Sequence, residues 1–112
     1  MINSITKFKF GEIWINGKKY QDDVILTNDS IETKESSHLV TREDIERLLI
    51  FDPEVIVIGT GSSGMVKIDE GARTLLTKEG IDLKVSKTPT AVNLFNNAVK
   101  NKRVAAIFHI TC

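Results

Sequence analysis

The chain has 112 residues, of which 41% are hydrophobic and 27% are charged, the proportions of an ordinary globular domain. Fifteen basic residues balance fifteen acidic ones, and this formal net charge of zero argues against nucleic acid as a partner, because domains that bind phosphate backbones carry a basic excess. The chain contains no apolar run near the roughly 20 residues of a membrane span, and its single cysteine, Cys112, allows no internal disulfide. We therefore expect one domain over residues 1–112, located in the cytoplasm and without membrane contact.

The first forty residues favour β-structure. Asn16-Gly17 is a strong hairpin signal, because a type I′ turn needs positive φ at both central residues, and it predicts that Glu12–Ile15 pairs with Lys18–Tyr20. Two further strands are expected at Asp23–Thr27 and Ile31–Lys34, with a polar turn between them.

Three larger polar or aromatic side chains of this half need an interpretation. Trp14 and Tyr20 are expected to pack on the hairpin and cover a face of the core. His38 follows a polar stretch and has no second His, Cys or paired carboxylate at metal spacing nearby, so we interpret it as a loop histidine bonded to backbone.

An amphipathic helix is predicted over Arg42–Ile50. Thr41 is a suitable N-cap, and the acidic residues that follow suit the positive end of the helix dipole. Apolar residues then recur at helical spacing, and the short connection through Pro53 predicts that this helix packs against the next strand.

That next strand is the continuous apolar run Val55–Ile58, which is typical of a strand covered on both faces. It leads into a G-x-G-x-x-G pattern at Gly59, Gly61 and Gly64. A phosphate-binding P-loop is excluded, because Met65-Val66 stands where that motif needs Lys and Ser or Thr.

Dinucleotide binding is also disfavoured. That fold needs an acidic residue at the end of the following strand to hold the ribose, but Asp82 lies at the start of the strand predicted here and Ser86 at its end. We therefore interpret the glycines as a strand-to-helix turn.

The rest of the chain alternates helices and strands. Asp69 is the expected N-cap of a helix that ends at Gly80, and the strand Ile81–Val85 follows. Thr88-Pro89-Thr90 is expected to cap a helix that runs to about Asn101, before a last buried strand at Arg103–Ile110. This β-α-β-α-β order predicts a parallel sheet with right-handed crossovers.

Parallel strands place their carboxyl ends on one edge of the sheet, where α/β proteins usually bind ligands. The candidate ligand-binding residues at this edge are Gly59, Thr60, Gly61, Ser62, Ser63, Gly64, Thr88 and His109. Main-chain amides of such a loop can hold a small anion, and we expect that replacing Gly61 by a bulky residue removes the site without unfolding the domain.

A catalytic pair of His109 and Cys112 is the alternative use of this edge. A terminal segment is often too mobile to hold reacting groups, and no third group that would orient the histidine follows from spacing. Asn96 and Asn97 are available on the preceding helix but are interpreted as facing solvent. We assign no catalytic residue, no metal ligand and no cofactor.

A family resemblance spans nearly the whole chain. Its most specific part is Arg103–Cys112, and it also covers Tyr20, Asp23-Val24, Ser37-His38-Leu39, Arg42–Leu49, Pro53-Glu54, Ile56–Gly61, Thr88, Ala91 and Phe95-Asn96. In these segments the chain resembles the Mth-nine-three-eight-like domain family, small single-domain α/β proteins of archaea and bacteria. Eukaryotic members include a mitochondrial assembly factor for respiratory complex I and an adipogenesis-associated protein.

The resemblance implies a three-layer α/β fold with a mixed central sheet and an additional antiparallel portion from the N-terminal half, but no activity. The chain departs from many members at Lys34 and Ser36-Ser37, where they carry a tryptophan and a glycine before the histidine. We expect a non-enzymatic protein-interaction or assembly-type factor, with a protein partner or a homo-oligomer. The alternative is a small-molecule or anion-binding protein, or an enzyme, that uses the glycine-rich loop with His109 as its acid or base.

Overall fold

The computed structural model describes all 112 residues around a five-stranded sheet of order β5-β4-β10-β7-β9. Its strands are β4 (Asp23–Thr27), β5 (Ile31–Lys34), β7 (Val55–Thr60), β9 (Asp82–Ser86) and β10 (Val104–His109). The strands β10, β7 and β9 are parallel, while β4 and β5 add antiparallel partners on the other side of β10. The predicted mixed sheet and its parallel second half are therefore confirmed.

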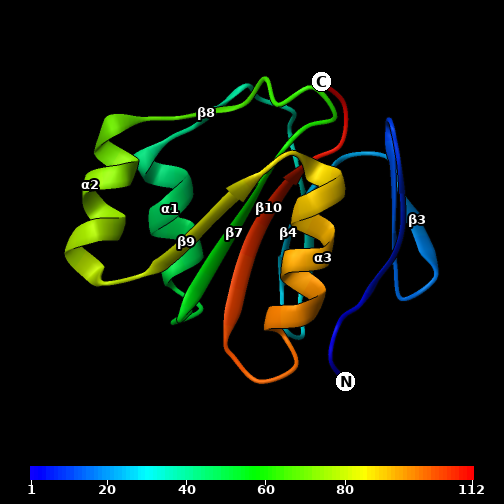
Figure 1. The fold of residues 1–112 in the computed structure, drawn as a ribbon, viewed down its shortest axis with the longest axis horizontal. Helices are drawn as coiled ribbons and strands as arrows, with labels where there is room; N and C mark the ends of the chain where they lie inside the picture. The colour runs from blue at the N-terminus through cyan, green and yellow to red at the C-terminus, as the bar shows by residue number, and fades with distance from the viewer.

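A separate three-stranded sheet contains β1 (Ile5–Lys9), β2 (Glu12–Ile15) and β3 (Lys18–Tyr20). The turn between β2 and β3 has φ of 54° at Asn16 and 82° at Gly17, and Ile15 faces Lys18 across it, as the hairpin prediction requires. Figure 1 shows this sheet beyond α3, on the side of the molecule away from α1 and α2.

The helices are α1 (Arg42–Leu49), α2 (Glu70–Glu79) and α3 (Thr88–Ala98). One apolar cluster joins α1 and α2 to the sheet through Ile45, Leu48, Leu76, Ile56 and Ile58. The second cluster lies on the opposite face, where α3 and the three-stranded sheet pack against residues such as Val57 and Phe108. The central sheet therefore has helices on both faces, which gives the expected three layers (Figure 1).

The predicted caps of the first two helices are confirmed. Thr41 forms a capping box with Asp44, and the side chain of Asp69 accepts a hydrogen bond from the amide of Gly71. Gly80 ends α2 with φ of 68°, the left-handed conformation that glycine adopts without steric cost. None of the three helices is both long and apolar enough to cross a membrane.

Three strands were not predicted by range: β1, in a stretch expected only to be β-rich, and two short strands. The strands β6 (Leu39–Val40) and β8 (Lys67–Ile68) pair in parallel, and the amide of Lys67 donates to the His38 carbonyl at 2.9 Å. A two-residue strand carries no periodicity, so only its tertiary partner makes it recognisable.

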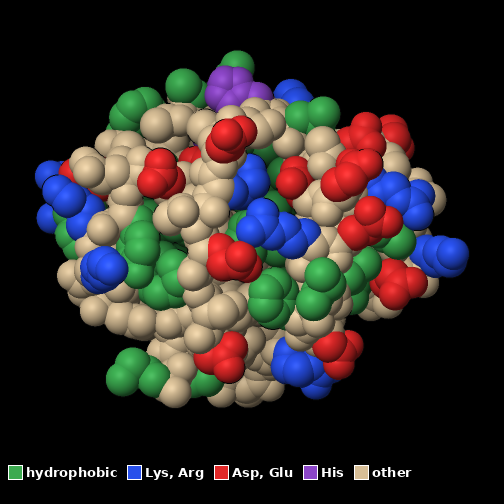
Figure 2. Space-filling model, turned by 180° about the vertical axis from the view of Figure 1, so that it is seen from behind, with side chains coloured by type: hydrophobic (Ala, Val, Ile, Leu, Met, Phe, Trp, Pro, Cys, Tyr) green, Lys and Arg blue, Asp and Glu red, His purple; other side chains and the backbone are tan.

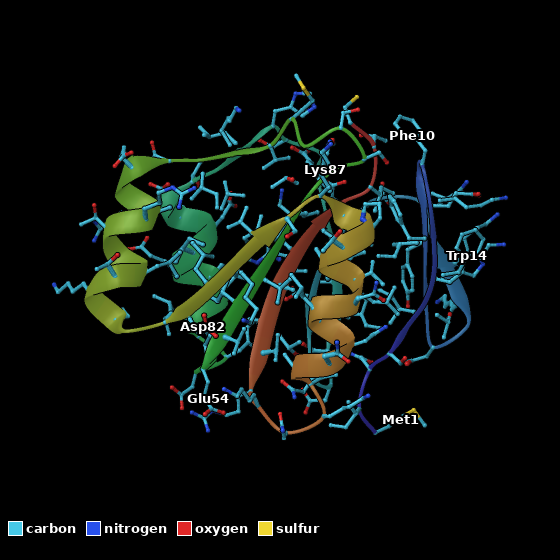
Figure 3. The ribbon with its side chains drawn as sticks, in the orientation of Figure 1. Met1, Phe10, Trp14, Glu54, Asp82 and Lys87 are labelled. Atoms are coloured by element: carbon cyan, nitrogen blue, oxygen red, sulfur yellow. The ribbon has the colours of Figure 1, made fainter.

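The prediction for Trp14 was wrong, whereas that for Tyr20 was right. Ile13 and Ile15 alternate into the core, so Trp14 points to the outer face of the small sheet, where Lys7 Nζ lies 4.8 Å from its ring centroid. Figure 3 shows the side chain of Trp14 directed away from the body of the molecule. Tyr20 packs against the core cluster.

The prediction that Asn96 faces solvent was also wrong. Its Nδ2 donates to the Ile5 carbonyl at 2.8 Å, and its Oδ1 accepts from the Ile5 amide at 2.9 Å. This amide side chain therefore ties β1 to α3.

The amino ends of β7 and β10 are joined by Glu54 and Arg103. The Arg103 amide donates to Glu54 Oε1 at 3.0 Å, and this hydrogen bond is the main cause that holds the pKa of Glu54 below its usual 4.5. Desolvation acts in the opposite direction, and the charges of Arg103 and Lys102 each lower the pKa by less. The contact aligns the two strands at the edge opposite the candidate site.

Candidate functional site

Three segments meet at the carboxyl edge of the parallel strands, as the sequence predicted: residues 59–64, 86–90 and 109–112. Thr88 Oγ1 accepts the Gly61 amide at 2.9 Å and donates to the His109 carbonyl at 2.6 Å. Thr60 Oγ1 donates to the Ser86 carbonyl at 3.1 Å. The edge is therefore a hydrogen-bonded cluster formed by sequence-distant loops.

Thr88 reaches this position because it is not the N-cap of α3. The N-cap is Lys87, which makes no side-chain capping bond, and Pro89 occupies the first turn, where it needs no hydrogen-bond partner. The capping role expected for Thr88 was wrong, because its buried hydroxyl bridges the glycine loop and β10 instead.

The main-chain amides of the glycine loop are already occupied by protein oxygens. Ser62 donates to the Thr111 carbonyl at 2.7 Å, and both Ser63 and Met65 donate to the Cys112 main-chain oxygen at 3.1 Å. The Gly64 amide donates to the Gly61 carbonyl at 3.3 Å. An anion could reach these amides only if Thr111 and Cys112 moved away.

Gly61 is required for this arrangement. Its φ is +99°, and a methyl group added there would overlap the main chain of Cys112 and crowd the His109 ring. A bulky residue at Gly61 would displace the 109–112 segment, so this substitution cannot remove a ligand site while leaving the surrounding structure intact.

His109 is buried, with 1% of its surface exposed, and both ring nitrogens have partners. Nδ1 lies 2.8 Å from Asp23 Oδ2, and Nε2 lies 3.1 Å from Thr111 Oγ1. The other oxygen of Asp23 accepts the Ile110 amide at 3.0 Å. In this arrangement the imidazole links β4, β10 and the C-terminal segment and presents no free nitrogen to solvent.

Asp23 is the partner of His109 that the sequence-based reasoning missed. It lies 86 positions away, at the start of an apolar strand, and it is buried. Because a buried carboxylate needs a partner, an acidic residue that opens a continuous apolar run was the available signal.

His38 contacts the cluster from outside. Its exposed ring lies edge-on to the His109 ring, with 5.1 Å between centroids. The expected bond from the His38 side chain to backbone is not formed, and it is the His38 carbonyl that binds main chain, at Lys67.

Three large apolar side chains are exposed at this edge among polar ones. Phe10 is 63% exposed, Met65 51% and Leu39 43%; we call these three residues the apolar rim. Hydrogen bonds place them around the C-terminal segment: Gly11, next to Phe10, donates to the Ile110 carbonyl, Met65 donates to Cys112, and Leu39 pairs with Lys67.

Charged side chains lie beside the apolar rim, since Lys67 and Lys87 are both exposed at this edge. Seen from behind, a histidine side chain lies at the top of the molecule with hydrophobic side chains on either side (Figure 2). Phe10 projects on one side of the C-terminal segment, and Lys87 lies on its other side (Figure 3). The thiol of Cys112 is exposed, and the nitrogens of His109 are bonded elsewhere.

Comparison with known proteins identifies relatives over the full length. Residues 5–109 match the model of a family described as Protein of unknown function (DUF498/DUF598). The conserved hypothetical protein PH1505 from Pyrococcus horikoshii has 28% sequence identity and a TM-score of 0.88, with 97% of this chain and 99% of that chain covered.

Two further structures are similar. An outer membrane protein from Bartonella henselae has 26% identity and a TM-score of 0.84, covering 99% of this chain and 97% of that one. A Bordetella pertussis protein described as a Mth938-like domain has 15% identity and a TM-score of 0.76, covering 96% of this chain and 85% of that one. At that identity the Bordetella protein shows a shared fold only, and it agrees with the family resemblance in the sequence.

Proposed function

This chain belongs to the DUF498/DUF598 family of proteins of unknown function, and from the geometry of its carboxyl edge we propose that it is a non-enzymatic interaction or assembly-type factor. In this proposal the apolar rim of Phe10, Leu39 and Met65 binds a protein partner. The observation that carries it is that the loop amides and the buried polar side chains of this edge are bonded internally, whereas three large apolar side chains remain exposed.

The side chains of the rim suit a protein contact. Aromatic residues and methionine are enriched in the buried centres of protein interfaces, and a rigid ring such as Phe10 fills a partner's pocket with little loss of conformational entropy. Clustered exposed apolar residues mark interaction surfaces more often than scattered ones do. The internal hydrogen bonds hold the surrounding loops in place and so preorganise the surface.

The test is affinity capture by the wild type and by the double variant Phe10→Ser/Met65→Ser, in extracts of the source cell. We expect a stoichiometric partner that the wild type retains and the double variant loses. The control is Ile50→Ser, because Ile50 is 80% exposed but lies at the end of α1, away from the rim. A set of bound proteins that is the same for all three would contradict the proposal.

Binding of a small anion by the glycine-rich loop stays a competing prediction. It requires Thr111 and Cys112 to leave the loop amides, because the amides of Ser62, Ser63 and Met65 donate to them. A thermal-shift screen against phosphates, nucleotides and small carboxylates tests it, since a ligand at about 100 times its Kd stabilises the folded state by about 2.7 kcal/mol. A clear shift would favour the anion-binding function over the interaction role.

The cytoplasmic location also remains a prediction. Fractionation of the source cell, with the chain followed by an antibody, measures it directly. Recovery in a membrane fraction after high-salt washing would contradict it.

A further inference from the structure

The second surface of interest is the outer edge of the central sheet at β9, remote from the apolar rim. The strand β9 is hydrogen-bonded on one side only, to β7. Asp82 starts this edge at the lower left of Figure 3, whereas Phe10 lies at the upper right. An unpaired edge strand presents free amides and carbonyls that can pair with another chain.

The hydrogen bonds to β7 define which groups of β9 are free. The Asp82 amide donates to the Glu54 carbonyl at 3.2 Å, and the Ser86 carbonyl accepts from Thr60, so these residues face β7. Main-chain groups alternate in direction along a strand, and those of Leu83 and Val85 therefore face outward. Val85 is also 38% exposed, so the edge combines free hydrogen-bonding groups with apolar surface.

The charged residues of β9 are arranged in a self-complementary way. Asp82 and Lys84 lie on the same face of the strand and form an ion pair, with 3.5 Å between Asp82 Oδ2 and Lys84 Nζ. Their side chains are 53% and 40% exposed. They line an open groove of about 320 Å³ beside the C-terminal part of α3, so the space above them is not filled by the chain itself.

We propose that β9 pairs antiparallel with β9 of a second copy of this chain, about a two-fold axis through Leu83. In this register Asp82 of each copy faces Lys84 of the other, Leu83 faces Leu83, and Val85 faces Ile81. Opposite charges and apolar side chains that face each other across strands both stabilise pairing. An axis through Lys84 would instead place the two lysines opposite each other, which disfavours that register.

The opposite edge of the sheet, β5, has a similar sequence pattern but is less suited to the same contact. Its acidic residue, Glu32, is already bonded to Arg47 at 3.0 Å, and the residue that would lie on the axis is the polar Thr33. Asp82 and Lys84 also form an ion pair, but it lies within β9 and can be exchanged for the same pair across the axis, whereas Glu32 would lose its bond to α1. Pairing at β5 would also bury less apolar surface. The second copy therefore binds at β9, and this inference does not depend on the function proposed for the apolar rim.

Analytical ultracentrifugation of the purified chain over a wide range of concentrations tests the proposal. We expect a concentration-dependent dimer for the wild type. Lys84→Asp places two carboxylates opposite each other at both symmetry-related positions, and we expect it to raise the dimer dissociation constant at least about tenfold. The double variant Asp82→Lys/Lys84→Asp exchanges the charges and should restore the dimer.

The matched control is Lys34→Asp, which makes the same charge change on β5. It should leave the dimer intact, while far-UV circular dichroism confirms that each variant is folded. Asp82→Lys provides a second single variant and should also weaken the dimer. A wild type that is monomeric at every concentration would overturn the proposal, and so would a dimer that survives Lys84→Asp or fails to return in the double variant.

Discussion

Among single residues, Asp23 is the buried acid that bonds to two buried groups at the carboxyl edge. Its two oxygens bind the His109 ring and the Ile110 amide, and all three groups are buried. Removing the carboxylate leaves two buried nitrogens without an acceptor, and each such group costs about 1–3 kcal/mol. The stability of the rim region therefore depends on a residue at the start of β4, far away in the sequence.

We predict that Asp23→Ala lowers the free energy of unfolding by about 2–4 kcal/mol, measured by urea denaturation. The neighbouring Asp22 is exposed and has no such partners, so Asp22→Ala should change stability by no more than about 0.5 kcal/mol. Equal effects of the two substitutions would show that the buried contact with His109 contributes little.

At the scale of elements, the three-stranded sheet is attached to α3 by apolar packing and by the side chain of Asn96. Asn96 of α3 holds Ile5 through two hydrogen bonds, and Ile5, Ile13 and Ile15 enter the core cluster shared with α3. The central sheet has no such dependence on Asn96, since its strands bond to one another. Loss of the Asn96 side chain should therefore loosen one element selectively.

We predict that Asn96→Ala accelerates amide hydrogen exchange in residues 5–15 and leaves β7 and β10 unchanged. Local opening of this kind has its own free energy, separate from global unfolding. Asn97→Ala is the control, because Asn97 is exposed and the gain in helix propensity is the same in both variants. Uniform acceleration throughout the chain would contradict a local attachment role.

At the scale of the whole molecule, the two proposed surfaces lie at different edges of one rigid sheet. The apolar rim surrounds the carboxyl ends of the strands, and the β9 edge runs along the side of the sheet. With Phe10 and Asp82 at opposite corners of Figure 3, both surfaces can be occupied at once. Substitutions at well-separated sites are expected to act additively.

We predict that Lys84→Asp weakens the dimer without changing partner capture, and that Phe10→Ser/Met65→Ser removes partner capture without weakening the dimer. Ultracentrifugation and affinity capture on the same preparations measure the two properties. Loss of both properties in either variant would mean that the two surfaces form one site.

The sequence by itself determined the helices and the strands of the central sheet, and their order. Hydrophobic periodicity located all three helices and the five strands of the central sheet, and Asn16-Gly17, Thr41, Asp69 and Gly80 placed a hairpin and the helix ends. These features depend on local physics, since a cap or a type I′ turn involves residues a few positions apart. The convergence of the three loops also followed, because parallel strands bring their carboxyl ends together.

Only the tertiary structure decided which hydrogen bonds and packing contacts those loops and the neighbouring elements form. The outward direction of Trp14 depends on which face of the small sheet packs against the core, where Ile13 and Ile15 lie. The pairing of Asp23 with His109 and the hydrogen bonds of Asn96 to Ile5 depend on partners distant in the sequence. The same holds for the glycine loop, whose amides are filled by Thr111 and Cys112. The sequence shows that a glycine-rich turn has main-chain amides that could bind a ligand. The main-chain oxygens of Thr111 and Cys112 compete with any ligand for these amides, and only the tertiary structure shows that they lie within hydrogen-bond distance.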